Sequence, residues 1–170
     1  VGGGQERGLR AGTLNVPGIV GLGRACEIAG ASLREEVARL IALRNRLHDR
    51  IASRLDGCGF NGCEQERLPG HLSLSFSGVS GTKLISGLRD IALSSGAACS
   101  SDTPVPSHVL SAMGRSDIEA QSTLRFGMGR FTLQSEVDYV ADRVVGLVGR
   151  LRGGVRDNGE NEYTEKTVAI

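Results

Sequence analysis

The sequence has no tryptophan, and aromatic residues make up only 4% of its 170 residues. This scarcity argues against a surface on which nucleic-acid bases stack. The net charge of +1 gives no electrostatic reason to expect a nucleic-acid or membrane partner. No apolar run is long enough to cross a bilayer. Four cysteines are too few for a disulfide-stabilised scaffold, so we expect a reducing compartment, the cytoplasm.

Glycine, by contrast, is abundant: the chain has 25 glycines, whereas globular proteins average about 7%. Hydrophobic residues at 39% and charged residues at 23% are typical of a globular domain, and the length suffices for one hydrophobic core. The sequence begins at Val1 and passes directly into three glycines. A start inside a glycine-rich loop indicates a fragment, so we expect a larger N-terminal portion of the protein.

Residues 1–15 combine five glycines with Arg7, Arg10 and Thr13. Glycine at this density is incompatible with a helix and lets the backbone approach a ligand closely. Backbone N–H groups, guanidinium groups and a hydroxyl together suit an anion. The segment lacks the Gly-Lys-Ser/Thr ending of a Walker loop. A mobile linker is the alternative interpretation.

Hydrophobic periodicity predicts helices and strands that alternate along the rest of the chain. Ser32 and Glu35 resemble a capping box, which predicts that a second helix begins there. Residues 153–170 are polar and rich in glycine, asparagine and glutamate, which predicts a disordered tail. Strands interrupted by helices predict an α/β or α+β layered domain. The expected helices cover residues 16–31, 32–55, 80–90, 107–113 and 132–151, and the expected strands cover residues 71–77, 91–93 and 122–131.

Residues 91–106 form an apolar strand followed by a loop of small residues around Cys99, which ends on two prolines. Small neighbours leave the Cys99 sulfur accessible and let the loop move, as a reactive thiol requires. A core thiol is instead packed among large apolar side chains. His108 follows either as a proton partner of this thiol or as a surface residue of the next helix. An inert loop cysteine is the alternative for Cys99.

Two further groups of residues suggest binding chemistry. Arg125 lies inside an expected strand between Leu124 and Phe126, where an arginine needs an anionic partner. That partner is either the carboxylate of a ligand or a structural acid. Cys58 and Cys63, together with a histidine at position 71, are compatible with a metal site, but the two-residue cysteine spacing of a zinc knuckle is absent. Plain loop cysteines are the alternative.

Three blocks of the sequence, residues 2–13, 94–100 and 124–131, resemble the signature blocks of NifS/IscS-type cysteine desulfurases. These are pyridoxal-phosphate enzymes of the class V aminotransferase family. The resemblance extends from residue 1 to about residue 151 and is to the C-terminal part of the family. It implies the C-terminal small domain of the type I pyridoxal-phosphate fold, with a short sheet packed against helices. The implied organisation is a cofactor-phosphate loop at 1–15, an α/β domain at 16–152 with a catalytic-cysteine loop at 94–106, and a tail at 153–170.

The resemblance also implies roles for single residues. Cys99 matches the nucleophile that takes sulfur from L-cysteine, leaving L-alanine and an enzyme persulfide. Arg125 matches the arginine that binds the substrate carboxylate. Thr13 matches the residue that reaches the phosphate of pyridoxal 5'-phosphate in the other subunit of a homodimer. In the iron–sulfur pathway, Cys99 is also expected to be a metal ligand, sharing a transient [2Fe-2S] cluster with a scaffold protein that accepts the sulfur.

The Schiff-base lysine of the family belongs to a segment that precedes the first block. Only Lys83 and Lys166 occur in the present sequence, and neither lies in the family's lysine motif. We therefore expect this chain alone to be inactive and to work as part of a longer or complemented enzyme. A selenocysteine lyase and a non-catalytic interaction module with the same fold remain as alternative functions.

Overall fold

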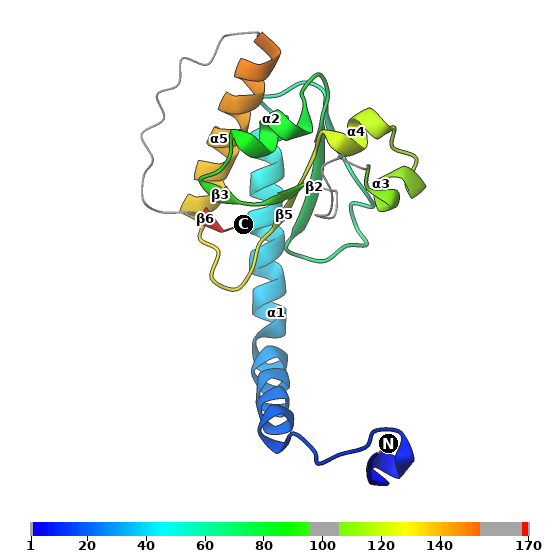
Figure 1. The fold of residues 1–170 in the computed structure, drawn as a ribbon. Helices are drawn as coiled ribbons and strands as arrows, with labels where there is room; N and C mark the ends of the chain where they lie inside the picture. Colours follow the sequence, from blue (N-terminus) through cyan, green and yellow to red (C-terminus); the bar gives the residue numbers. More distant parts are fainter. Residues whose placement is uncertain (1, 96–105, 154–167, 170) are drawn as a thin grey trace. The chain divides into compact units, whose positions relative to one another are not determined.

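The computed structural model describes residues 2–95, 106–153 and 168–169. The chain divides into two compact units, Val1–Glu36 and Val37–Ile170, which we call the N-terminal and the C-terminal unit. Figure 1 shows the elements coloured along the chain. They are η1 (Gln5–Gly8), α1 (Val16–Ala52), β1 (Cys58–Phe60), β2 (His71–Phe76), α2 (Gly81–Ser86), β3 (Ile91–Ala92), β4 (Ser94–Ser95), α3 (His108–Ala112), α4 (Asp117–Gln121), β5 (Thr123–Gly127), α5 (Gln134–Gly153) and β6 (Val168–Ala169). The remaining tail residues, 154–167 and 170, lie outside the described part.

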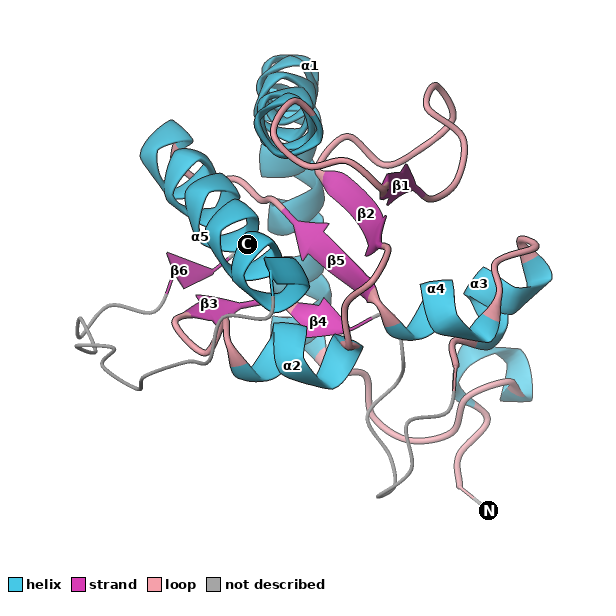
Figure 2. Ribbon diagram, turned by 90° about the horizontal axis from the view of Figure 1, so that it is seen from above, coloured by secondary structure: helices cyan, strands magenta, loops and turns pink. Residues whose placement is uncertain are grey.

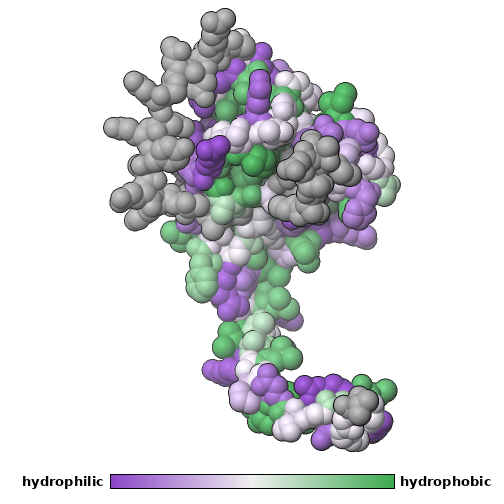
Figure 3. All heavy atoms as spheres, in the orientation of Figure 1, coloured by the Kyte–Doolittle hydropathy of each residue, from purple (hydrophilic) through white to green (hydrophobic). Residues whose placement is uncertain are grey.

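The N-terminal unit contains η1, a glycine-containing loop and the first turns of α1. The expected break at Ser32 is wrong, because the Ser32 hydroxyl donates to the carbonyl of Ile28 (3.1 Å) instead of capping a new helix. Cys26 is exposed, although its apolar neighbours favoured a buried position. Figure 3 shows apolar side chains among polar ones on the surface of this unit. The exposed apolar residues are Leu9, Leu14, Val16, Ile19, Val20, Leu22, Ile28 and Leu33.

The C-terminal unit is built on an antiparallel sheet with the strand order β1-β2-β5-β4 (Figure 2). Its register pairs Leu72 with Phe126 and Leu74 with Leu124, so these apolar side chains share one face. β1 was not expected from the sequence, because three residues in a turn-rich stretch give no periodic signal. A separate parallel pair joins β3 to β6. The predicted α/β architecture, a short sheet packed with helices, is confirmed.

The hydrophobic core fills the space between this apolar face and the helices of the C-terminal unit. Residues 37–52 of α1 and the apolar side of α5 supply most of the helical side chains, and α2 adds Leu84. Burying each large side chain contributes about 1.5–3 kcal/mol, so this layer dominates the stability of the unit. The fully buried residues at its centre include Leu47, Ile51, Leu72, Leu74, Phe76, Leu84, Leu88, Leu124, Phe126, Val137, Val140, Ala141, Val144 and Val148.

Arginines of α1 connect that helix to α5 along one edge of the core. Arg46 binds Asp138 with two parallel bonds, from Nε to Oδ1 (2.6 Å) and from the terminal nitrogen to Oδ2 (2.8 Å). Arg50 and Arg54 both donate to Asp142, at 3.0 Å and 2.7 Å. The guanidinium of Arg46 lowers the pKa of Asp138. Because these pairs are partly exposed, they contribute little to the free energy of folding. Their main effect is to fix the register between the two helices.

Asp90 forms a second link to α5 at the start of β3. Its carboxylate accepts two bonds from Arg143 (2.7 and 2.8 Å) and one from the Tyr139 hydroxyl (2.6 Å). These donors, Arg143 foremost, lower the pKa of Asp90 from 3.8 to about 2. The Asp90 side chain is only 17% exposed, so solvent screens the interaction weakly. The link therefore favours the charged carboxylate in the folded state.

The depressed pKa of Asp90 predicts how stability depends on pH. The ionised carboxylate stabilises the fold by about 2 kcal/mol at neutral pH, and this contribution is lost as the pH falls from about 4 to about 2. We expect Asp90→Asn to lower the free energy of unfolding by that amount at pH 7, and the deficit to disappear near pH 2. Urea unfolding of both proteins across this range measures it. Asp49→Asn, at a side chain that is 77% exposed, is the control and is expected to change stability by less than about 0.5 kcal/mol. An Asp90→Asn deficit that is the same at every pH would contradict the assignment.

Candidate functional site

The second face of the sheet is polar. In β2 the side chains that alternate with the core leucines are those of His71, Ser73 and Ser75. In β5 the corresponding residues are Thr123 and Arg125. The register pairs Arg125 with Ser73 on one side and with Ser94 of β4 on the other. Residues from three strands therefore meet on one face, which we call the polar face.

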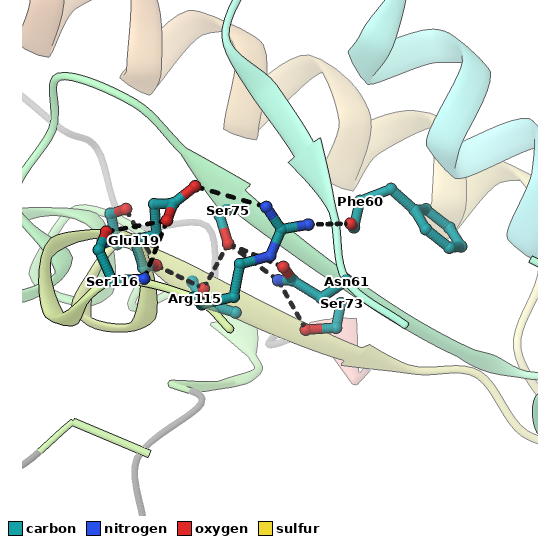
Figure 4. A network of polar contacts seen from close by, with 9 residues as sticks. Phe60, Asn61, Ser73, Ser75, Arg115, Ser116 and Glu119 are labelled. Carbon is teal, nitrogen blue, oxygen red and sulfur yellow. Dashed lines mark hydrogen bonds and ion pairs between the residues drawn. The ribbon is translucent and has the colours of Figure 1, made fainter. Parts of the chain in front are cut away.

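One half of the polar face is closed by a hydrogen-bonded network, shown in Figure 4. The Asn61 amide donates to the hydroxyls of Ser73 (3.3 Å) and Ser75 (2.9 Å). The Ser75 hydroxyl also bonds that of Thr123 (2.7 Å), which in turn donates to the carbonyl of Glu119 in α4 (2.7 Å). All four of these polar side chains are buried. Because each polar group is paired, the network rigidifies the strands beside Arg125.

The helix α4 lies against this closed half, and hydrogen bonds at the N-terminus of the helix hold it in place. Ser116 and Glu119 form a capping box, which sequence inspection missed although its pattern is readable at these positions. The adjacent Arg115 donates to the carbonyl of Phe60 (2.5 Å) and pairs with Glu119 (3.4 Å), as Figure 4 shows. These bonds connect α4 to β1 across the edge of the sheet.

The other half of the polar face is open and contains Arg125 and His71. Arg125 is exposed, and its guanidinium has no hydrogen bond or ion pair with any residue in the described part of the chain. His71 is half-buried, and burial together with the charges of Arg125 and Arg67 lowers its pKa. Its imidazole is therefore neutral at neutral pH. The predicted strand position of Arg125 is confirmed, and within the described residues no structural acid occupies its guanidinium.

The turn after β5 is fixed by Arg39 of α1. The Arg39 guanidinium donates to the carbonyls of Gly129 (3.0 Å), Arg130 (2.6 Å) and Thr132 (2.8 Å). Three bonds from one planar group define the path of this turn. Gly70 adds a constraint, because a Cβ there would overlap the carbonyl oxygen of Met128. Periodicity alone assigns Arg39 to a solvated helix face, so sequence reasoning missed its role.

The predicted nucleophile, Cys99, lies outside the described residues, as do the other residues of the 96–105 loop. The strand that leads into this loop is β4, and its Ser94 pairs with Arg125. On the far side of the loop, His108 is the first residue of α3 and is exposed. The roles of Cys99 and His108 therefore stay predictions.

Thr13 belongs to the N-terminal unit, in the loop between η1 and α1. Arg10 donates to the carbonyls of Gly12 (3.0 Å) and Thr13 (2.9 Å), and the Gly12 N–H donates to the Gln5 side chain (3.1 Å). Gly12 has a φ of 92°, which a residue with a Cβ rarely adopts. The exposed Thr13 hydroxyl has no partner in the described part of the chain. The loop therefore has a defined backbone that presents a free hydroxyl.

A metal site at Cys58, Cys63 and His71, which the missing zinc-knuckle spacing already argued against, is not found among the residues that the structure describes. No group of three or more histidine, cysteine, aspartate or glutamate side chains in this part of the chain is able to hold a metal ion. Cys58, Cys63 and His71 do not form such a group. Of the described helices, none has the length and apolar character needed to cross a membrane.

Comparison with known proteins identifies the fold and its family. The family described as aminotransferase class V matches residues 3–140. The chain belongs to this family. A solved structure described as a NifS-like protein superimposes with a TM-score of 0.71 at 36% identity, over 87% of this chain and 37% of that one. A NifS-like protein from Rickettsia africae has a TM-score of 0.74 at 21% identity, over 88% of this chain and 39% of that one, which supports the fold alone.

The curated proteins that this chain is similar to include cysteine desulfurases. The IscS cysteine desulfurase of Anaeromyxobacter sp. (strain Fw109-5) is 50% identical over 151 residues, which is 89% of this chain and 37% of that protein. The cysteine desulfurase of Mus musculus is 46% identical over 89% of this chain and 33% of that protein. The resemblance to NifS/IscS-type proteins is thus confirmed. The chain spans about a third of the length of the curated relatives that it matches.

Proposed function

We propose that this chain supplies the sulfur-transferring part of a pyridoxal-phosphate-dependent cysteine desulfurase. The observation that supports this most directly is the open half of the polar face. It contains the guanidinium of Arg125, which has no partner among the described residues, and that arginine pairs across the sheet with Ser94. Ser94 lies at the entrance to the loop that contains Cys99. Arg125, which is able to bind a carboxylate, therefore lies in β5, and the loop with the candidate nucleophile Cys99 follows the adjacent strand β4.

Arg125 has the chemistry to hold the α-carboxylate of L-cysteine. A planar guanidinium forms two parallel charge-assisted bonds to a carboxylate, which fixes both the position and the orientation of the substrate. The closed network on one side and the Arg39-bound turn on the other hold the strand of Arg125 in place. The carboxylate site is therefore preorganised before substrate binds.

Cys99 is proposed as the group that receives the sulfur. It lies four residues beyond Ser95, and four residues of chain span at most about 14 Å, a reach that allows its thiol to meet a substrate held by Arg125. Its thiolate attacks the substrate sulfur, a sulfur–sulfur bond forms, and the bond from the substrate Cβ to sulfur breaks. The carbon fragment takes up a proton and leaves as L-alanine, and the persulfide stays on Cys99.

The N-terminal loop fits the phosphate of pyridoxal phosphate. Its Thr13 hydroxyl is free to donate, and it follows Gly12, whose backbone lacks a Cβ that would block a close ligand. When bound, the cofactor withdraws electrons from the substrate and so weakens its Cβ–S bond. Thr13 is proposed to hold the phosphate of the cofactor in the other subunit of a homodimer. The same proposal includes transfer of the persulfide sulfur to an iron–sulfur scaffold protein in the cytoplasm. Cys99 is then a shared ligand of the [2Fe-2S] cluster.

A chimera tests this function. The chain replaces the 151-residue stretch that it matches in the Anaeromyxobacter IscS protein. We expect the purified chimera to release alanine from L-cysteine in the presence of a reductant, and mass spectrometry to find one added sulfur atom on Cys99. Cys99→Ser is expected to reduce turnover by at least about 1000-fold, because a hydroxyl does not replace the thiolate nucleophile. Cys63→Ser, at an exposed cysteine outside the site, is the control and is expected to leave turnover unchanged.

The same assay separates the other functions. A chimera that binds pyridoxal phosphate but turns over selenocysteine and not cysteine would indicate a selenocysteine lyase. A correctly folded chimera without turnover of either amino acid would reject the enzymatic proposal and favour an interaction module. The chain without the grafted remainder is expected to show no turnover, since neither Lys83 nor Lys166 lies in the family's lysine motif.

A further inference from the structure

His71 lies beside Arg125 on the open half of the polar face. In the register of the sheet, His71 pairs with Gly127 and Ser73 pairs with Arg125. His71 and Arg125 are therefore diagonal neighbours on the same face, a relation in which side-chain roots lie about 7 Å apart and long side chains reach one another. Two groups that both hydrogen-bond anions are thus directed toward the same region.

The two side chains share a second property, which is that neither has a partner among the described residues. No hydrogen bond or ion pair joins the His71 ring to another residue of the described part of the chain, and the same holds for Arg125. A half-buried imidazole without a hydrogen bond is costly unless a ligand or water satisfies it. The polar face therefore presents two adjacent hydrogen-bond donors that are available to a ligand outside the described part of the chain.

Arg67, the other cation that acts on His71 in the described part of the chain, is already occupied. Arg67 donates to the carbonyls of Cys63 (2.6 Å), Asn61 (3.0 Å) and His71 (3.5 Å), and its guanidinium lies 3.8 Å from the centre of the Phe60 ring. Arg67 thereby fixes the loop that leads into β2, including the backbone of His71. Arg67 therefore positions the histidine, and the side chains available to bind a ligand are those of His71 and Arg125.

We propose that His71 is a second contact for the carboxylate that Arg125 binds. Its ring N–H donates to a carboxylate oxygen while the guanidinium holds the group from the neighbouring strand. The identity of the ligand as an amino acid rests on the proposed function; the pairing of the two donors rests on the register alone. Burial and the charges of Arg125 and Arg67, the charged groups that act on His71 within the described residues, lower its pKa and keep the ring neutral at neutral pH. A neutral ring still offers one N–H donor.

Histidine NMR on the 170-residue chain tests the contact without any enzymatic activity. The chain has three histidines, so His48 and His108 act as internal controls. We expect L-alanine to shift the ring signals of His71 in a saturable manner and to raise its pKa, because a bound anion favours the protonated ring. L-alaninamide, which lacks the carboxylate, is expected to leave His71 unchanged. Arg125→Gln is expected to abolish the response to L-alanine and to raise the pKa of His71 in the free chain.

Kinetics of the chimera provide the second measurement. We expect His71→Leu to raise KM for L-cysteine about 10-fold with kcat nearly unchanged, the size of one lost hydrogen bond to a charged group. His71→Asn, whose amide also donates, is expected to restore KM to within about threefold of the parent. A purely structural role for His71 would not separate these two variants.

The outcomes distinguish this inference from the proposed function. A parent chimera that is active, with the same KM in His71→Leu, overturns the role of His71 and leaves the desulfurase proposal intact. A parent chimera that is inactive, with a carboxylate-dependent shift of His71 in the free chain, supports the anion contact and rejects the enzymatic proposal. Signals of His71 that do not respond to L-alanine, or respond equally to L-alaninamide, overturn the contact itself.

Discussion

Replacing Arg125 with lysine in the chimera is expected to lower kcat/KM for L-cysteine by about 100-fold. Lysine keeps the positive charge but offers a point donor instead of a planar fork, so the two parallel bonds to the carboxylate are lost. Orientation of the substrate is lost with them, and this affects kcat as well as KM. Steady-state measurement of alanine release provides both parameters.

A matched control separates this effect from a general loss of charge. Arg89 is also exposed but lies between α2 and β3, outside the polar face. Arg89→Lys is expected to leave kcat/KM within about twofold of the parent, because a surface arginine away from the site contributes little. Equal values of kcat/KM in the parent and in Arg125→Lys would show that Arg125 does not bind the substrate carboxylate. A loss of folding is detected by comparing the melting temperatures of the two variants.

The substitution Gly81→Ala is expected to destabilise the C-terminal unit by about 3 kcal/mol. Gly81 is the first residue of α2, and an added Cβ would overlap the backbone carbonyl of Gln121 at the end of α4. The carbonyl oxygen and carbon of Gln121 are backbone atoms and are unable to rotate away, as a side chain would. Either α2 or α4 therefore has to shift. Such a shift also disturbs the buried network that α4 covers. Urea unfolding monitored by circular dichroism measures the change.

Gly149→Ala is the control for this prediction and has the opposite expected sign. Gly149 is an exposed position inside α5, where an added Cβ meets no atom within 4 Å. Alanine is therefore expected to stabilise the helix by up to about 1 kcal/mol, through the lower flexibility of the unfolded chain. Equal stability of Gly81→Ala and the parent would show that α2 and α4 are less closely packed than described.

Local patterns in the sequence predicted much of this fold. The expected strand at residues 71–77 matches β2, the expected strand at 122–131 contains β5, and the expected helix at 107–113 matches α3. The break predicted at Ser32 was wrong, because a capping-box pattern within a continuous apolar periodicity does not interrupt a helix. Local signals therefore located elements better than they located helix boundaries.

The arrangement around Arg125 was only partly predictable. An arginine between two core residues of a strand indicated a required anion, and the structure places it on the open half of the polar face. The pairing with Ser94 and the closeness of His71 depend on strand register between segments distant in sequence, which no local pattern specifies. The network of Asn61 with Thr123 is non-local for the same reason. The roles of Cys99 and Thr13 stay predictions.

The buried network beside Arg125 is made of an amide and hydroxyls, none of which gains or loses a proton in the physiological range. The scaffold of the site is consequently insensitive to acidity, even though the site is built for ionic chemistry. A change in activity between weakly acidic and weakly alkaline buffer is then not explained by titration of this network, whereas the imidazole of His71 does titrate near that range. A bell-shaped profile would describe titrating groups at the reaction site rather than a loosening of the buried network.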